Sequence, residues 1–351
     1  MGWSSKDLRN DLKELRKMYN QETDINKKEE LLSAINTLML TICDIEIGED
    51  SYTDINDWFL LFKSVPSFSM YYPDIYKFIN TLNASNLECF DNIIPCSDKE
   101  EIKKEDIFAM MHDFYKSVGK EIFNYFLEID NDHDKYINYD EEMESTDGIT
   151  YYVPILNKRY YSIGSCGDNR ELLSTLTHEY GHSIASVINP KRYFNDDFFT
   201  EIESIFFELI GLDYYYDITK DKYFSDLIVD KTNTYYWSAN NVTAMKRVSD
   251  KTFKNMNDEI SSLKYCKKYL KEEGFDEKTI SIDVDDKMKY LFSYIVAIEL
   301  FEIYKEDKGL AINLLKNIVN RDKDISEYAS IYSNVVPVKS LKKHLERIKR
   351  Y

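Results

Sequence analysis

Apolar residues recur at helical spacing along most of the chain. Near the start of the chain, two stretches with this spacing are separated by residues 21–26. The repeating positions are Leu8, Leu12, Leu15 and Met18, and then Leu31, Leu32, Ile35, Leu38 and Met39. Similar patterns predict helices at 54–62 and 75–82, with Pro66 and Pro73 interrupting them. The pattern therefore predicts an N-terminal part built from helices.

The middle of the chain changes its pattern. A helix is predicted from Asp106 to about Leu127. Two short runs rich in β-branched and aromatic residues follow, at 149–155 and 159–163, and they predict a small β-hairpin or edge sheet. Helical spacing then returns, and Asp168 is placed to cap the new helix at its N-terminus. The apolar stripe of that helix consists of Leu172, Leu173, Leu176, Ile184, Val187 and Ile188.

Another helix is predicted from about Asp197 to Ile210, and the last third of the chain again has helical spacing. The predicted fold class is therefore mostly α, with a small hairpin or sheet beside the helix after Asp168. The segment 92–105 contains a proline and a dense run of charges, which marks a boundary. We expect an N-terminal helical subdomain at 1–95 and a second region at 96–351.

Composition narrows the classes of protein. With 45 Lys+Arg against 63 Asp+Glu, the net charge of −18 disfavours a surface for phosphate backbones, so no nucleic-acid partner is expected. The five cysteines form no CxxC pair, which disfavours a disulfide framework and a thiolate metal site. The N-terminus lacks an apolar signal segment, and the most apolar stretch, 290–301, is too short to cross a bilayer. We expect a cytoplasmic protein with no membrane partner.

One motif carries recognisable chemistry, and it lies in the helix after Asp168. His178-Glu179-Tyr180-Gly181-His182 is an HExxH, whose spacing places both imidazoles on one helical face, one turn apart. There the two rings can bind one metal ion, and Glu179 can hold a water beside it. A catalytic zinc takes three protein ligands and keeps one position open. The motif therefore predicts a zinc site that needs one more ligand.

The third ligand is expected from the next predicted helix. Glu201, Ser204 and Glu208 lie close together on its helical wheel, whereas Glu203 lies on the opposite flank. Eighteen residues separate His182 from Glu201, which is enough for a turn and a returning helix. Spacing alone does not decide between Glu201 and Glu203.

Two segments together resemble a known family. The run from Thr177 to Ser183, followed by Glu201-Ile-Glu-Ser-Ile-Phe-Phe-Glu208, resembles the thimet oligopeptidase and oligoendopeptidase F family of gluzincin zinc metallopeptidases. The resemblance implies that Glu201 is the third ligand and Ser204 the serine of the family motif. It also implies that Glu208 lies behind a ligand histidine and orients it.

The aromatic segment 290–295 resembles one near the C-terminus of that family, in which a tyrosine reaches the substrate carbonyl. Tyr294 is the matching position. A core aromatic is the alternative interpretation of Tyr294 in a chain with 29 tyrosines. Ile282 and Lys287 occupy the positions of a family His and a family Tyr, so this part of the chain has diverged.

The resemblance implies a helical zincin-type fold in which 96–351 is the catalytic zinc-peptidase region. It also implies a zinc-dependent metalloendopeptidase that cuts short, unfolded peptides in a cleft between the N-terminal and the catalytic helices. One Zn²⁺ per chain would be held by His178, His182 and Glu201, with Glu179 as general base and Tyr294 as a donor to the oxyanion. A catalytically weak or inactive zinc-binding homologue that acts as a protein-interaction module is the main alternative. A gluzincin exopeptidase is another, although no group that would bind a peptide terminus is evident.

The acidic segment 130–141 is a separate candidate site. Acids occupy positions 1, 3, 5 and 12 of an EF-hand calcium loop, but Lys135 stands at the sixth position, where glycine normally makes the turn. The alternative is an acidic loop that caps a short helix beginning near Asn138.

Overall fold

The computed structural model describes somewhat more than half of the chain. The described residues are 5–24, 27, 28, 30, 31, 34, 35, 38, 95, 96, 99, 101–131, 136–140, 147–153, 156–164, 167–190, 200–232, 284–320, 343, 344, 346 and 347. The helices predicted at 54–62 and 75–82 lie outside them. Within the described residues the fold is mostly helical with one small sheet, as the sequence predicts, and no helix is long and apolar enough to span a membrane.

The sheet has three strands in the order β1-β3-β2. The predicted hairpin is confirmed, because β2 (Gly148–Val153) pairs antiparallel with β3 (Lys158–Gly164). β1 (Ile137–Asp140) pairs parallel with β3, so residues near Asn138 form a strand and not the short helix of the alternative interpretation. Its sequence, Ile-Asn-Tyr-Asp, alternates with the period of a strand, and the Ile137 side chain is buried in the core. In an EF-hand, a helix would begin at the end of the segment 130–141, where this protein has the strand β1.

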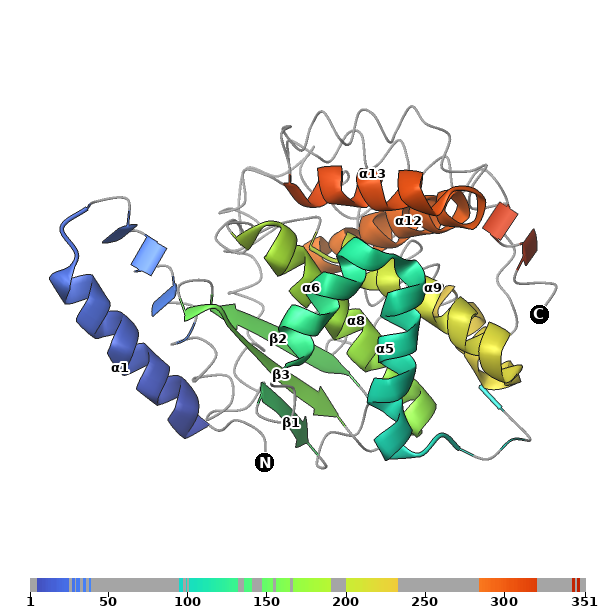
Figure 1. Cartoon of the computed structure of the whole chain (residues 1–351), viewed down its shortest axis with the longest axis horizontal. Helices are drawn as coiled ribbons and strands as arrows, with labels where there is room; N and C mark the ends of the chain where they lie inside the picture. The colour runs from blue at the N-terminus through green and yellow to red at the C-terminus, as the bar shows by residue number, and fades with distance from the viewer. Residues whose placement is uncertain are drawn as a thin grey trace, which may run out of the picture.

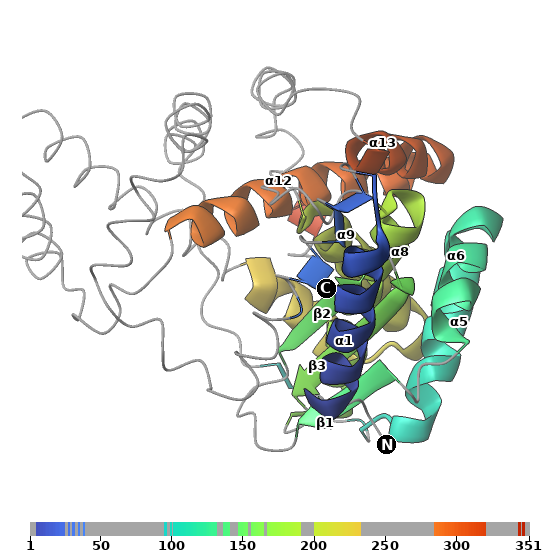
Figure 2. The same cartoon turned by 90° about the vertical axis from the view of Figure 1, so that its left-hand side faces the viewer.

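Helices cover both faces of the sheet (Figure 1). Side chains alternate along β3, so that Tyr160 packs on the side of α1 (Ser5–Gln21) and Tyr161 on the side of α8 (Asn169–Ile188). The Tyr161 hydroxyl lies 2.6 Å from Oγ of Ser183 on α8. The perpendicular view shows α1 in front of the strands and α8 beyond them (Figure 2). The sheet therefore fixes one side of the helix that carries the HExxH motif.

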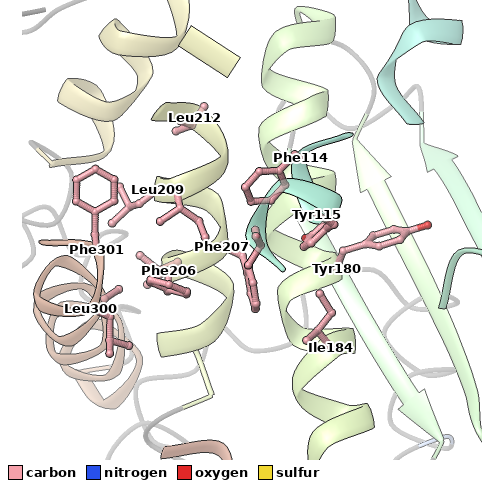
Figure 3. Close-up of a cluster of buried hydrophobic side chains, with 14 of the residues drawn as sticks. Phe114, Tyr115, Tyr180, Ile184, Phe206, Phe207, Leu209, Leu212, Leu300 and Phe301 are labelled. Carbon is pink, nitrogen blue, oxygen red and sulfur yellow. The ribbon is translucent and has the colours of Figure 1, made fainter. Parts of the chain in front are cut away.

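The main core lies on the α8 side. The helices around it are α5 (Ile107–Val118), α6 (Lys120–Asp130), α9 (Ile202–Thr219), α12 (Val284–Glu306) and α13 (Lys308–Asn320). In Figure 3, α9 stands between α8 and α12, with Phe207 on the α8 side and Phe206 on the α12 side. A smaller apolar cluster joins α1 and buried helical positions between 31 and 38 to the other face of the sheet. The boundary at 95/96 stays a prediction.

Two of the predicted helices begin or end differently from expectation. The helix expected from Asp106 to about Leu127 is two helices, because Gly119 between them adopts a φ of 150°, which the α-helix does not allow. The helix expected from Asp197 begins at Ile202, after a turn at positions 200 and 201. The predicted cap is confirmed, since the Asp168 side chain accepts a hydrogen bond from the backbone N–H of Arg170.

Helices α8 and α9 approach each other closely at Gly181, inside the HExxH motif. A Cβ atom at Gly181 would lie 2.7 Å from Cα of Ser204 and 3.2 Å from the carbonyl oxygen of Glu203, and both of these are backbone atoms. Backbone atoms cannot move aside as a side-chain tip can. The glycine therefore allows the two helices to come together where their acidic and imidazole side chains meet.

Replacing Gly181 with Ala is expected to lower the free energy of unfolding by about 1–3 kcal/mol, because the added methyl overpacks the contact between α8 and α9. Chemical denaturation of both proteins measures the change. Gly309→Ala is the matched control, since a Cβ at Gly309 would meet only a side-chain oxygen at 3.4 Å near the exposed start of α13. Equal stability of the two variants would contradict the close approach at Gly181.

Candidate metal centre

The HExxH histidines and one glutamate converge on a single point. The imidazoles of His178 and His182 project from α8, and Glu201 immediately precedes the first residue of α9. The Nε2 atoms of both rings lie 3.4 Å from the same oxygen, Oε2 of Glu201. One ligand atom from each of the three residues lies within 4.8 Å of the others. The three residues predicted as ligands are therefore brought together.

This spacing fits a tetrahedral metal ion. Zinc bonds to histidine nitrogen and carboxylate oxygen at about 2.0–2.2 Å, so neighbouring ligand atoms of a tetrahedron lie about 3.3–3.6 Å apart. The two distances of 3.4 Å between Nε2 and Oε2 fall in that range. Two imidazoles and one carboxylate are also a donor set found in catalytic zinc sites. The donor atoms and their spacing thus fit Zn²⁺.

Each histidine has a second carboxylate behind it. Nδ1 of His178 lies 3.2 Å from Oε2 of Glu208, and Nδ1 of His182 lies 3.6 Å from Oε1 of Glu203. A carboxylate at Nδ1 keeps the proton on that nitrogen and leaves Nε2 as the electron-pair donor. Glu208 therefore lies where the resemblance placed it. Glu203, which the sequence placed on the opposite flank, faces the other histidine.

Four glutamate side chains near the two rings are buried. Glu179, Glu201, Glu203 and Glu208 are each at most 5% exposed. Buried carboxylates are rare unless cations or hydrogen-bond donors compensate them. A cation held between the histidines would supply such compensation, so the charge of the site favours a metal ion.

The electrostatics of the two histidines follow from these neighbours. Burial by itself lowers the pKa of His178, but hydrogen bonds to Glu201 and Glu208 outweigh it and raise the pKa to about 9. Burial likewise opposes protonation of His182, and Glu201 and Glu203 raise its pKa to about 10. For Glu201, burial is outweighed by the two imidazoles, which hold its pKa well below the usual range. The site thus favours positive charge at the point where the three residues meet.

Glu179 points from α8 toward the edge of the sheet. Its carboxylate accepts a hydrogen bond from the Thr150 hydroxyl on β2. Gly148, two residues earlier on the same strand, leaves room for it: a Cβ there would lie 2.8 Å from Cγ and Oε1 of Glu179. The second residue of the HExxH motif is therefore held by β2, the strand that ends the described sheet.

Glu208 is held on both of its oxygens. Oε1 accepts a hydrogen bond from Ser174 Oγ at 2.8 Å and lies 2.7 Å from Nζ of Lys231, while Oε2 faces His178. Burial raises the pKa of this carboxyl, but the positive charges of Lys231 and His178 outweigh it and lower the pKa to about 2. Lys231 lies on the helical segment that follows α9, residues 222–232.

Tyr294 lies on α12 and is buried. Its hydroxyl lies 2.5 Å from Oγ1 of Thr232, the residue after Lys231. Burial raises the pKa of this phenol far above its usual value. The helical segment 222–232 thus contacts both Glu208 and Tyr294 in its last described turn.

No protein-family model matches the sequence, and no curated protein matches it. Solved structures do match. A protein assigned as an oligoendopeptidase F from Bacillus anthracis str. Ames matches with a TM-score of 0.57 at 11% identity, over 93% of this chain and 64% of its own. PZ peptidase A, solved with an inhibitor, matches with a TM-score of 0.53 at 12% identity, over 92% of this chain and 65% of its own.

A further oligoendopeptidase F structure matches with a TM-score of 0.51 at 13% identity, over 98% of this chain and 65% of its own. The chain has the fold of these peptidases. It spans just under two thirds of the length of each. The resemblance drawn from the HExxH segment and the segment after it is thus confirmed at the level of the fold.

Several residues of the site could not be identified from the sequence. Thr150 and Lys231 are an ordinary strand threonine and an ordinary helix lysine in the sequence, and only the packing of β2 and of residues 222–232 brings them to Glu179 and Glu208. For Glu203 a signal existed. It lies two residues after Glu201, and a turn rather than a helix at Glu201 allows both carboxylates to face α8.

Proposed function

We propose that this protein is a zinc-dependent endopeptidase that hydrolyses peptide bonds within short, unfolded peptides. The observation that carries the proposal is the convergence of two Nε2 atoms on one oxygen of Glu201, with a further carboxylate behind each ring. The fold shared with oligoendopeptidases supports the same reaction class. His178, His182 and Glu201 are the proposed ligands of one Zn²⁺ per chain.

The residues around the ligands have distinct tasks in the proposed mechanism. Zinc supplies Lewis-acid chemistry, since it lowers the pKa of a bound water toward about 7 and polarises a carbonyl. Glu179 accepts a proton as the water oxygen attacks the peptide carbonyl carbon. It then gives that proton to the amine nitrogen as the C–N bond breaks. The side chains of Glu203 and Glu208 orient the ligand histidines.

β2 is the strand that we propose receives the peptide. Among the described residues it lies at the end of the sheet, and its Gly148 and Thr150 contact Glu179. An extended peptide can add to a strand at the edge of a sheet through its main-chain N–H and C=O groups. Such pairing places an internal bond, rather than a terminus, next to the general base. It requires an extended substrate, so folded proteins are expected to be spared.

Two measurements on one preparation test the proposal. Metal analysis of the purified protein is expected to find about one zinc per chain, as three protein ligands and an open position imply. Digestion of a peptide mixture, analysed by mass spectrometry, is expected to show cleavage at internal bonds. Bound zinc without any hydrolysis would favour the non-catalytic homologue, and release of single terminal residues alone would favour an exopeptidase.

Tyr294 is proposed as the donor to the oxyanion that forms when water attacks the carbonyl. A phenol aimed at that oxygen stabilises the transition state more than the neutral carbonyl. Tyr294→Phe is therefore expected to lower kcat by about 10- to 1,000-fold and to leave KM nearly unchanged, as measured by steady-state peptide hydrolysis.

The contact with Thr232 defines the competing role of this tyrosine. If the hydroxyl serves only to join α12 to Thr232, Tyr294→Phe reduces stability and leaves kcat within about twofold of wild type. Thr232→Val is the informative control, because it removes the partner of the hydroxyl and keeps the phenol. Normal zinc content in both variants separates either effect from loss of the metal site.

A further inference from the structure

We infer that Lys231 is a positioning residue of the metal centre, acting on His178 through Glu208. The inference rests on the proposed zinc site. Nζ of Lys231 lies 2.7 Å from Oε1 of Glu208, whose other oxygen lies 3.2 Å from Nδ1 of His178. Lysine, glutamate and histidine thus form a continuous chain of contacts that ends at a proposed zinc ligand.

The contacts fix the orientation of the Glu208 carboxylate. Lys231 and Ser174 both bind Oε1, and this leaves Oε2 directed at the imidazole. Ser174 lies one turn before His178 on α8, so it anchors the carboxylate from the same helix as the ligand. Lys231 anchors it from a different helical segment. Without Lys231, the Ser174 hydroxyl would be the one partner left to Oε1 among the residues that the structure describes, and the carboxylate could rotate away from Nδ1.

The segment that carries Lys231 is itself fixed to α8. Asp221, just before it, accepts hydrogen bonds from the backbone N–H of Tyr223 at 3.0 Å and from Nη1 of Arg170 at 2.8 Å. Arg170 is in the first turn of α8, and its guanidinium carbon lies 4.0 Å from the centre of the Tyr223 ring. The segment 222–232 is therefore attached near the start of α8 and reaches Glu208 with its last described turn.

Two physical effects of Lys231 on metal binding have opposite signs. Its positive charge repels a divalent cation, so charge alone predicts tighter zinc binding when the lysine is removed. Its contact with Glu208 orients His178, so this positioning effect predicts weaker zinc binding when the lysine is removed. The sign of the change in zinc affinity therefore distinguishes the two effects. Replacing a residue that served only the stability of the fold would leave the zinc affinity of the folded protein unchanged.

The experiment measures the zinc dissociation constant of the full chain at one fixed pH, by competition with a chromophoric chelator. Lys231→Met keeps the length of the side chain and removes its charge and donors. It is expected to weaken zinc binding by about 10-fold, the lower end of the usual effect of losing an outer partner of a ligand histidine, because Glu208 itself remains. Lys231→Arg, which keeps a cationic donor, is expected to stay within about threefold of wild type.

Two further variants test the route of the effect. Lys222→Met removes another lysine of the same segment, one paired with Asp226, and is expected to leave zinc affinity unchanged. In a Glu208→Gln background, Lys231→Met is expected to cause less than about a twofold further loss, because the carboxylate through which it acts is already gone. Circular dichroism verifies that each variant is folded, and Lys231→Gln replaces Lys231→Met if the latter is not.

The outcomes separate this inference from the proposed function. Unchanged or tighter zinc binding in folded Lys231→Met would overturn the inference, and so would an equal loss with and without the Glu208 carboxylate. Wild-type protein that binds zinc but cuts no peptide would overturn the peptidase proposal and leave the role of Lys231 standing on affinity. Wild-type protein that binds no zinc would overturn both.

Discussion

Replacing Glu179 by Gln is expected to lower the rate of peptide hydrolysis by at least about 100-fold, within the range usual for loss of a general base. The amide keeps the size of the side chain and can still hydrogen-bond with the Thr150 hydroxyl, but it cannot accept the proton of the attacking water. Zinc content is expected to stay at the wild-type level, because the three proposed ligands are unchanged. Initial rates of peptide hydrolysis and metal analysis of the same samples measure the loss of activity and the zinc content.

Glu105→Gln is the matched control, since Glu105 is exposed and lies in the short 3₁₀ turn at Lys104–Asp106. Its activity is expected to equal that of wild type. If Glu179→Gln retained full activity, the proton would have to go elsewhere, and the proposed mechanism would lose its base. If the variant instead lost zinc, Glu179 would act in holding the metal rather than in the proton transfer.

The sequence predicted the elements whose pattern is set within one segment. The helix of the HExxH motif, its cap at Asp168 and the hairpin of β2 and β3 are present as expected. Each follows from local spacing: a helical apolar stripe, a side chain that accepts from the first turn, and two β-rich runs joined by a short turn. Such signals do not depend on the rest of the fold.

The expectations that differ from the structure have two causes, a strand partner distant in sequence and a local signal that does not decide the structure. β1 is only four residues long, and it is stable because it pairs with β3, which comes after β2 in the chain. A helix and a short strand are equally compatible with so few residues, so the sequence could not decide between them. The break at Gly119 had a local signal, but a glycine inside a helical pattern is often tolerated.

The same division holds for the site. His178, His182 and Glu179 follow from spacing on one helix, and the resemblance selected Glu201 as the third ligand where spacing left Glu203 open. The structure gives the two glutamates different neighbours: Glu201 faces both Nε2 atoms, and Glu203 faces Nδ1 of His182. Glu201 is the residue just before α9, whereas Glu203 lies in its first turn.

The charges around the histidines are arranged in two layers. Glu201 lies on the Nε2 side of both rings, where we propose that the metal binds. Glu203 and Glu208 lie behind the rings, and Lys231 lies behind Glu208. Burial makes each uncompensated carboxylate costly, so these layers are expected to depend on one another and on the metal. Substitutions on the Nε2 side of the rings should therefore abolish zinc binding, whereas substitutions on the Nδ1 side should only weaken it.

Glu201→Ala is accordingly expected to abolish stoichiometric zinc binding, as are His178→Ala and His182→Ala, whereas Glu203→Ala should weaken binding by about 10- to 100-fold and retain it. Removing Glu201 takes away a donor atom and leaves two imidazoles, which do not complete the three-ligand set of a catalytic zinc. Removing Glu203 leaves all three donors and loses only the carboxylate that faces Nδ1 of His182. Zinc titration of the metal-free proteins, followed by chelator competition, resolves the two cases.

The comparison of Glu201 with Glu203 is a strict test because the two residues have the same side chain and similar burial. Both are buried glutamates, two residues apart, beside the same histidine, so loss of a buried charge and the creation of a cavity affect both alanine variants similarly. The response of each variant to zinc, and not its stability without metal, is therefore the quantity to compare. Strong stabilisation of Glu203→Ala by zinc and none of Glu201→Ala is the expected result. The reverse order would mean that the donor comes from α9 itself, at Glu203, and that Glu201 serves the fold.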